Sequence, residues 1–564
     1  MAQSVKNFKN TSRNFAYLIP IILGTLFGMC SFIGRHEGKI NIGNILLYAN
    51  ILFYILLFAL AFFAIAKITA YANRHRSSLD KPFAPLRRIT LDWSPRSIIT
   101  LWCAITALWI PYFITYFPGV YWYDTSWQLM EYFDSSVPFT DHHPFMMTYL
   151  FVGFAHIGKA LFNNAIYGLY LLILIQALLS TLSIACATCY TAKYNVPWKC
   201  RLFMALFLAV FPIIPMLSMT LAKDTFNTPF FVFFSIAFCE LWKTQGTILK
   251  SVPFDIFFVI DVLAVSLTKK TGMYIVILAM IFLVCTAIKS WRRKLGTLIL
   301  AGIPYLIVGV VIPTFVLPTL HIAPGESNEI LAVPMQQVAN VAHNHKDDLS
   351  ASEITDIEQI YHMDINQLQQ AYCWYKADPI KGQQLSSEDE HKLIRTWAEQ
   401  LIKHPGDMLA AWGDLSAAWF SFNVTVGNDR NLSMLLPISN SGHHYQGIER
   451  YVPWVDNTKA GNAVETFYMD TLLATPVFNV IWQKAFWATI LPSAIMFLIL
   501  TFGRQKKKLN LLTLNAPMLI TMLVLFAGPI STYTEATRYV LPMLYIVPLF
   551  LFLTLGQLQS EDDR

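Results

Sequence analysis

The sequence predicts an all-α polytopic membrane protein with about 12 transmembrane helices. It also predicts an interfacial helix in the first large outer loop and one extracytoplasmic α-rich or α+β domain. Charged residues make up 13% of the 564 residues, whereas a soluble protein carries roughly 25%. Hydrophobic residues make up 55%, and the mean hydropathy is +0.47. These values exclude an ordinary soluble enzyme and a disordered chain.

The predicted spans follow from the length that a helix needs to cross the hydrocarbon core, which is about 20 mostly apolar residues. The stretches that meet this rule are 15–34, 44–66, 98–117, 165–191, 201–221, 226–242, 252–268, 271–288, 295–317, 477–501, 511–530 and 539–556. The first stretch is long and lacks a small-x-small cleavage site, so we expect an uncleaved signal anchor.

One further apolar stretch, residues 144–161, is shorter and carries His156 and Lys159. The basic linkers of the chain alternate correctly across a membrane only if this stretch does not cross it. We therefore predict a helix that lies along the membrane surface. The resulting topology is a multi-pass protein of the cell membrane with both termini in the cytoplasm.

The topology divides the chain into four predicted parts. Residues 1–97 hold two spans and a basic cytoplasmic loop, and 98–317 form a transmembrane module with an outer loop at 118–164. Residues 318–476 form an acidic extracytoplasmic domain, and 477–564 hold three spans and a cytoplasmic tail. The acidic domain has 9 Lys and Arg against 20 Asp and Glu. Within it, 348–375 and 386–403 have helical patterns, the second with an N-terminal capping sequence at Ser386.

Ionisable residues are rare in this chain, and those near a membrane surface are the functional candidates. The predicted topology brings the candidates to the outer surface from separate loops. They are Trp122, Tyr123 and Asp124, then His142 and His143, then Lys223 and Asp224, then Lys269 and Lys270, and finally Arg538.

This combination suits a reaction between a membrane-bound anion and an acceptor outside the membrane. Lys and Arg side chains hold a lipid-linked phosphate and stabilise the charge that grows on it as it leaves. A carboxylate removes the proton from an incoming hydroxyl. Trp and Tyr rings pack on a sugar or on an isoprenoid chain.

Each candidate also has a purely structural interpretation. Asp124 could be a solvated loop residue, and Arg538 an ordinary interface anchor. Lys269 and Lys270 could end two spans by extending to the headgroups. His142 and His143 resemble half of a metal site but lack a third ligand nearby, so we favour a structural or substrate-contact role and assign no metal ligand.

The order of these motifs resembles the GT-C superfamily of integral membrane glycosyltransferases, which includes protein O-mannosyltransferases and aminoarabinose transferases. The resemblance lies in Asp124 in an early outer loop, His143-Pro144 before an interfacial helix, Asp224 in Lys223-Asp224 at a later span, and Arg538-Tyr539 with Pro542. It covers roughly residues 98–317 and the last three spans. The chain looks most like an uncharacterised bacterial branch of the superfamily.

The resemblance implies a transferase that uses a polyprenyl-phosphate-linked sugar and acts on the extracytoplasmic side. Asp124 would be the general base, and Asp224 would orient donor or acceptor. Lys269, Lys270 and Arg538 would contact the donor phosphate, and His143 would line the site. The acceptor would be a cell-surface glycan, a teichoic-type polymer or a lipid. Some members carry an acidic pair where this chain has Asp124 alone, so a need for Mg²⁺ or Mn²⁺ stays open.

Two other function classes remain. About twelve spans with both termini inside also suit a transporter or a flippase for lipid-linked glycans, and Asp255 and Asp261 in the seventh predicted span favour that class. A non-catalytic scaffold for envelope assembly would act through its outer domain. The basic residues form no stripe and the net charge is +6, so no nucleic-acid partner is expected.

Overall fold

The structure is a computed structural model that describes residues 2–86, 88–325, 327–381, 384–427, 431–436, 444–454, 458–472, 475–504, 507–533 and 536–559. It is 78% helical. The strands of the described part are β1 (Val120–Tyr121) and β2 (Thr220–Leu221), which pair in parallel. The predicted all-α class is confirmed.

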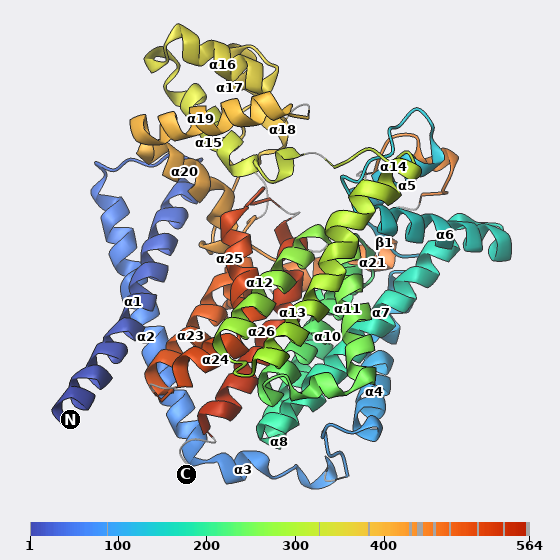
Figure 1. The fold of residues 1–564 in the computed structure, drawn as a ribbon, viewed down its shortest axis with the longest axis vertical. Helices are drawn as coiled ribbons and strands as arrows, with labels where there is room; N and C mark the ends of the chain where they lie inside the picture. The colour runs from blue at the N-terminus through green and yellow to red at the C-terminus, as the bar shows by residue number, and fades with distance from the viewer. Residues whose placement is uncertain are drawn as a thin grey trace.

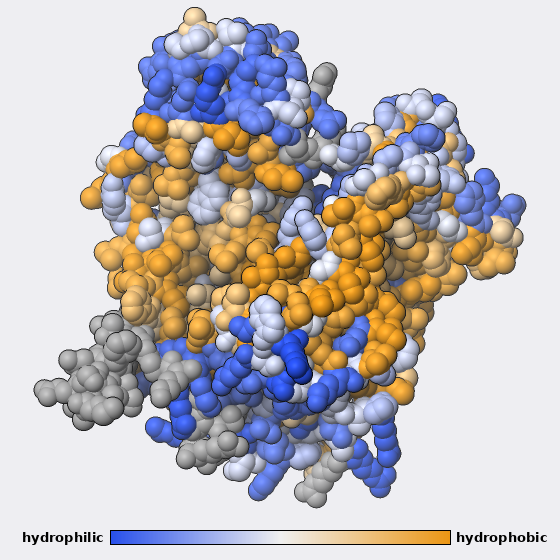
Figure 2. Space-filling model, viewed as in Figure 1, coloured by the Kyte–Doolittle hydropathy of each residue, from blue (hydrophilic) through white to orange (hydrophobic). Residues whose placement is uncertain are grey.

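Eight described helical segments are long and apolar enough to cross a membrane, or up to nine if a bent pair counts as one. Most run side by side (Figure 1), and their side chains form a hydrophobic belt between two hydrophilic ends (Figure 2). The chain therefore has the build of a polytopic membrane protein. The segments belong to α1 (Ala2–Arg35), α2 (Ile45–Arg74), α4 (Pro95–Thr115), α6 (Phe145–Phe162), α7 (Ala165–Tyr190), α10 (Lys223–Thr244), α13 (Trp291–Leu306) with α14 (Leu317–Thr319), and α26 (Ala536–Gln559).

The expected number of about twelve spans is not confirmed, because several apolar stretches are broken or short. The stretch 201–221 is split at Pro212 into α8 (Trp198–Val210) and α9 (Ile213–Ser218). The stretch 511–530 bends by 71° between α24 (Lys508–Leu514) and α25 (Ala516–Ala527). The helices α11 (Val252–Thr268) and α12 (Lys270–Thr286) have 17 residues each, which is about 25 Å. Hydropathy averages cannot detect such breaks.

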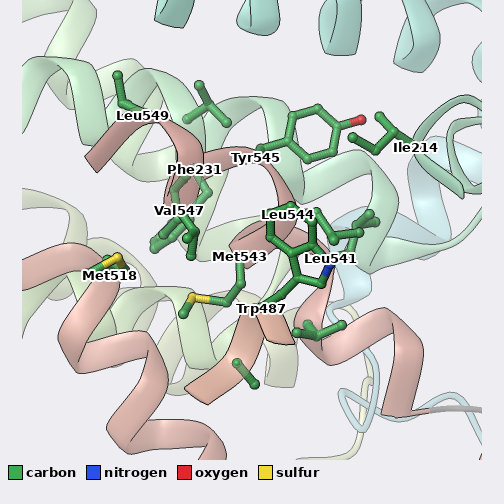
Figure 3. Packing of buried hydrophobic residues seen from close by; sticks show 14 of the residues in the cluster. Ile214, Phe231, Trp487, Met518, Leu541, Met543, Leu544, Tyr545, Val547 and Leu549 are labelled. Carbon is green, nitrogen blue, oxygen red and sulfur yellow. The ribbon is translucent and has the colours of Figure 1, made fainter. Parts of the chain in front are cut away.

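Helices α10 and α26 are the most enclosed spans, each with 83% of its apolar window buried. Figure 3 shows side chains of α26, among them Leu544 and Tyr545, packed against Phe231 of α10, Ile214 of α9 and Trp487. By contrast, 17% of the α2 window and 11% of the α4 window are buried, so their apolar side chains face outward. The two central helices therefore form a rigid support for residues at their ends.

Helix α6 meets the length test for a span, but in Figure 1 it runs across the direction of α7 and its neighbours. Asn163, in the left-handed region, ends α6, and the Asn164 side chain caps α7. Gly158 and Gly168 bring the two helices into backbone contact, since a Cβ at Gly168 would lie 1.8 Å from the Phe154 carbonyl oxygen. That α6 lies along a membrane surface stays a prediction.

Residues 332–416 form a helical cap at one end of the bundle (Figure 1). Its helices are α15 (Ala332–Asn344), α16 (Ala351–Tyr361), α17 (Ile365–Ala371), α18 (Asp378–Lys381), α19 (Ser387–Lys403) and α20 (Pro405–Ser416). The cap has its own core around Met335, Ile357 and Leu393. The predicted helix 386–403 and its Ser386 cap are confirmed, whereas 348–375 is divided between α16 and α17.

The predicted domain 318–476 is not one structural unit. Beyond the cap, Trp419, Phe420, Leu435 and Ile448 join the core of the transmembrane bundle. The helices α21 (Lys459–Phe467) and α22 (Pro476–Ile481) follow, and α23 (Leu491–Phe502) returns into the bundle. The apolar residues of 417–454 alternate with polar residues and form no stretch long enough to span a membrane, so the sequence does not distinguish them from the core of an independent domain.

Candidate functional site

The two short strands place the two predicted carboxylates. Tyr121 pairs with Leu221, and each strand is followed by a helix with an aspartate at its second position: Asp124 in α5 (Tyr123–Phe133) and Asp224 in α10. The Thr125 hydroxyl donates to the Leu221 carbonyl oxygen at 2.6 Å and locks the two segments together. A helix N-terminus favours a carboxylate in its first turn. The pairing thus sets both acids at the cap end of the bundle.

Asp124 lies among three basic side chains from three other segments. Its Oδ2 accepts a hydrogen bond from Nη1 of Arg538, at the start of α26. The same oxygen lies 3.6 Å from Nζ of Lys223 and 3.9 Å from Nε2 of His143. Nζ of Lys223 also lies 2.6 Å from Nδ1 of His143. The side chain of Asp124 is 16% exposed, so these groups replace most of its water.

Asp224 is fully buried and pairs with a second lysine. Its Oδ1 lies 2.6 Å from Nζ of Lys269, in the turn between α11 and α12, and its Oδ2 lies 4.0 Å from Nε of Arg538. Asn227 fixes that turn by donating to the Val265 carbonyl oxygen at 2.9 Å and to the Thr268 hydroxyl at 2.7 Å. Arg538 therefore links the two carboxylates. We call Asp124, His143, Lys223, Asp224, Lys269 and Arg538 the ionic cluster.

Aromatic rings enclose the arginine of the cluster. The guanidinium carbon of Arg538 lies 5.3 Å from the ring centre of Trp122 and 5.0 Å from that of Tyr539. Nζ of Lys269 lies 5.6 Å from the Tyr539 ring centre. Cations over aromatic faces are attracted by the ring quadrupole. Tyr539 follows the predicted arginine directly, but nothing in the sequence alone pointed to its contacts with both cations.

The charges of the cluster are unbalanced. Burial alone would raise the pKa of Asp124, but Arg538 and Lys223 outweigh burial and hold this pKa well below its usual range. Burial and the charge of Lys223 hold the pKa of His143 well below 6.5, so its imidazole is neutral at pH 7. Three cations (Lys223, Lys269, Arg538) thus face two carboxylates, leaving one net positive charge.

Three other predicted residues lie at the edge of the cluster. Lys270 pairs with Asp141 at 2.8 Å, and its side chain is 44% exposed. His142 contacts the ring of His143, with ring centres 4.6 Å apart. Tyr123 is exposed at the start of α5. Of the predicted residues, the structure unites Asp124, Asp224, His143, Lys223, Lys269 and Arg538 in the ionic cluster, and the Trp122 ring packs on Arg538.

An apolar cavity of about 110 Å³ opens beside the cluster. Its walls come from α10, α12, α25 and α26 and include Phe231, Ile275 and Leu525, together with Trp419 from the segment after the cap. Lys269 and Tyr539 line it as well, so two residues belong both to the cavity and to the cluster or its aromatic edge. The contribution of Trp419 could not be predicted from the sequence, because this residue lies in the middle of the predicted outer domain.

Comparison with known protein families assigns the chain to one of them. A model described as a family of unknown function (DUF6020) matches residues 133–564. The chain belongs to this family. The DUF6020 match includes the cluster residues from His143 to Arg538, whereas Asp124 and Trp122 precede it. No curated protein and no solved structure matches the chain.

The donor set of the cluster does not fit a divalent cation. Asp124 and Asp224 are both paired with lysine or arginine, and the local excess charge is positive. A Mg²⁺ or Mn²⁺ ion needs oxygen ligands that are not already neutralised by cations. The ionic cluster is therefore not suited to hold Mg²⁺ or Mn²⁺.

The adjacent lysines give a matched stability test. Lys269→Met removes the nearest counter-charge of the buried Asp224, which we expect to cost about 3 kcal/mol of folding free energy. Lys270→Met breaks a partly exposed pair and should cost below about 1 kcal/mol. Thermal unfolding of the purified protein in detergent measures both. Asp224→Asn added to Lys269→Met should restore most of the loss; equal losses for the two single variants would contradict the assigned pairing.

The pH dependence of stability tests the environment of His143. In the unfolded chain this residue binds a proton near pH 6.5, whereas the folded site resists it. Its contribution to stability is therefore complete above pH 6.5 and is lost as the pH falls toward the folded pKa, by about 1.4 kcal/mol per pH unit. In His143→Gln, the free energy of unfolding should fall less steeply between pH 6.5 and 5 than in the wild type. The exposed control His391→Gln should keep the wild-type slope, and parallel curves for His143→Gln and wild type would refute the assignment.

Proposed function

We propose that this protein is a membrane glycosyltransferase. It transfers a sugar from a polyprenyl-phosphate-linked donor to a hydroxyl group of an acceptor at the cap end of the bundle. The observation that supports this best is the junction of cluster and cavity at Lys269 and Tyr539. A site that is cationic on one side and apolar on the other suits an anionic headgroup on a hydrocarbon chain.

The charge of the ionic cluster favours a phosphate ligand. A phosphodiester carries one negative charge, which would cancel the net positive charge of the cluster. Lys269 lines the cavity and Arg538 packs on Tyr539, which lines it as well. Arg binds phosphate oxygens with two parallel N–H groups. Lys270, beside Lys269 and partly exposed, can reach a second phosphate oxygen if its pair with Asp141 opens.

The cavity supplies the apolar half of the donor site. Aliphatic and aromatic side chains dominate its lining, and they come from the helices α10, α12, α25 and α26. Each buried CH₂ group of a lipid contributes about 0.8 kcal/mol to binding. The first isoprene units of a polyprenyl chain would fill this cavity, and the remainder would lie in the membrane.

Asp124 is the general base of the proposed reaction. It takes the proton of the acceptor hydroxyl while the oxygen forms a bond to the anomeric carbon of the sugar. The bond between that carbon and the phosphate oxygen breaks, and its electrons leave with polyprenyl phosphate. Arg538 and Lys269 stabilise the charge on the leaving phosphate. Atoms and charge balance without a further reactant.

The proposed location is the cell membrane, with the reaction on the extracytoplasmic side and both termini in the cytoplasm. The basic segment with α3 (Arg76–Asp80) lies at the end of the bundle opposite the cap (Figure 1), in keeping with the positive-inside rule. The acceptor is a cell-surface glycan, a teichoic-type polymer or a lipid. The exposed ring of Tyr123 at the edge of the cluster would contact it.

One observation favours the transporter class as a second candidate. Asp261 lies in α11, is 3% exposed, and has no hydrogen-bond partner for either carboxylate oxygen within the described residues. Acidic side chains inside membrane helices often carry protons or ions. A transporter would depend on a gradient and on Asp261, whereas the transferase depends on Asp124 and needs no gradient.

The transferase proposal predicts a selective loss of turnover for Asp124→Asn. Removal of a general base lowers a rate by about 10²- to 10⁴-fold. We would measure sugar transfer from a polyprenyl-phosphate-linked donor by the purified protein in vesicles without an ion gradient. In parallel, we would measure the surface-glycan composition of a deletion strain complemented with each variant.

Asp134→Asn is the matched control, because Asp134 lies at the end of the same helix and the hydrogen bonds of its side chain in the described structure go to the neighbouring Ser136. It should keep wild-type turnover. Melting curves of both variants exclude unfolding as the cause of a loss. Full transfer by folded Asp124→Asn would refute the assignment of the base, and gradient-dependent movement of an unmodified lipid would favour the transporter.

A second prediction tests the cavity. Val524 lines it, whereas the neighbouring Leu523 is 57% exposed and does not. Val524→Trp should displace two or three methylene groups of the donor, a loss of about 2 kcal/mol, and raise the KM for a long-chain donor about 30-fold. Leu523→Trp should not change it. Neither change should alter the KM for a donor analogue that lacks the isoprenoid chain. An unchanged KM for the long-chain donor in Val524→Trp would place the lipid elsewhere.

A further inference from the structure

A second cluster of metal-ligating side chains lies in the cap, remote from the ionic cluster in the sequence. His345 follows α15, His404 lies between α19 and α20, and Asp407 is in the first turn of α20. One potential ligand atom from each lies within 4.8 Å of the others. All three side chains are partly buried. The proposed transferase reaction uses none of them.

We propose that His345, His404 and Asp407 bind a divalent transition-metal ion of the Zn²⁺ type. Two imidazole nitrogens and one carboxylate oxygen are ligands that Zn²⁺ commonly takes, with a fourth position for water. Ligands at about 2.0–2.1 Å from a tetrahedral ion lie roughly 3.3 Å apart. The 3.1 Å between Nε2 of His345 and Oδ2 of Asp407 fits this spacing.

The surroundings of His345 support this assignment independently. Its Nδ1 lies 3.3 Å from Oδ2 of Asp348, while its Nε2 faces Asp407. A neutral imidazole has one N–H, so it can donate to one of these carboxylates only. If Nδ1 donates to Asp348, the lone pair of Nε2 faces the Asp407 oxygen, and a cation between them removes the repulsion. A histidine that binds zinc through one ring nitrogen commonly donates the N–H of the other nitrogen to a carboxylate, as His345 would to Asp348.

The backbone around the site is already fixed. Asn340 of α15 donates to the Asp407 carbonyl oxygen at 2.9 Å, and Gln337 donates to that of Met408 at 2.6 Å. The rings of His345 and His404 are stacked, with centres 4.5 Å apart and planes 25° apart. Only side-chain rotations are needed to close the site on an ion. The metal would join the end of α15 to the corner between α19 and α20.

The test uses the full-length protein in detergent with a histidine-free affinity tag. After chelator treatment and desalting, Zn²⁺ is added, free metal is removed, and bound metal is measured by mass spectrometry. We expect about one Zn²⁺ per chain in the wild type, none in His345→Ala or His404→Ala, and an unchanged value in His391→Ala, which removes an exposed histidine of α19. Asp348→Asn should weaken binding by about 10- to 100-fold without abolishing it.

Two results would overturn the proposal. One is a wild-type protein that binds no Zn²⁺ under these conditions, and the other is a loss in His391→Ala as large as in His404→Ala. If the alanine variants unfold, the Asp348→Asn affinity and the visible spectrum of the Co²⁺-loaded wild type decide the question. A spectrum typical of six-coordinate Co²⁺, with no effect of Asp348→Asn, contradicts the site. The result is independent of sugar transfer, so failure of one proposal leaves the other intact.

Discussion

The ion pair between Asp124 and Arg538 holds the candidate site together. It joins the segment after β1 to the first turn of α26, which are 414 residues apart in the sequence. Buried charges are costly unless they are paired and hydrogen-bonded. Once Arg538 is enclosed at the end of the central helix, the segments that carry Asp124 and Asp224 must meet there. His143 and Lys223 lie beside Asp124 and Lys269 pairs with Asp224, so the segment before α6, the start of α10 and the turn between α11 and α12 meet at the same point.

Much of the site could be predicted because charges are rare in this chain. In a sequence with 13% charged residues, Asp124, Lys223-Asp224 and Arg538 stand out beside apolar runs, and the topology places them at one end. Their pairing could not be predicted. It depends on two strands of two residues, too short to leave a pattern, and on the choice of Asp224 as the partner of Lys269 while Lys270 pairs with Asp141.

The fold was harder to predict from the sequence where polar residues and prolines interrupt apolar stretches. Hydropathy treats 201–221 as one span, although the chain breaks at Pro212. Periodicity identified α19 because its capping residues and amphipathic pattern are local. The proximity of His345 and His404 could not be predicted, for the opposite reason. They are 59 residues apart in the sequence, and the packing of α15 against α20 brings them together. The likeness to GT-C glycosyltransferases rests on the order of short motifs and stays a proposal.

The low pKa of Asp124 has a consequence for the order of the proposed reaction. A carboxylate held by Arg538 and Lys223 is a poor base, because its negative charge is already stabilised. A donor phosphate that binds Arg538 competes for the same N–H groups and weakens that stabilisation. The pKa of Asp124 then rises toward its usual value, and the carboxylate gains basicity only when the donor is in place. The same charges that hold the empty site together would thus delay proton removal until a leaving group is present, so that donor binding precedes activation of the acceptor.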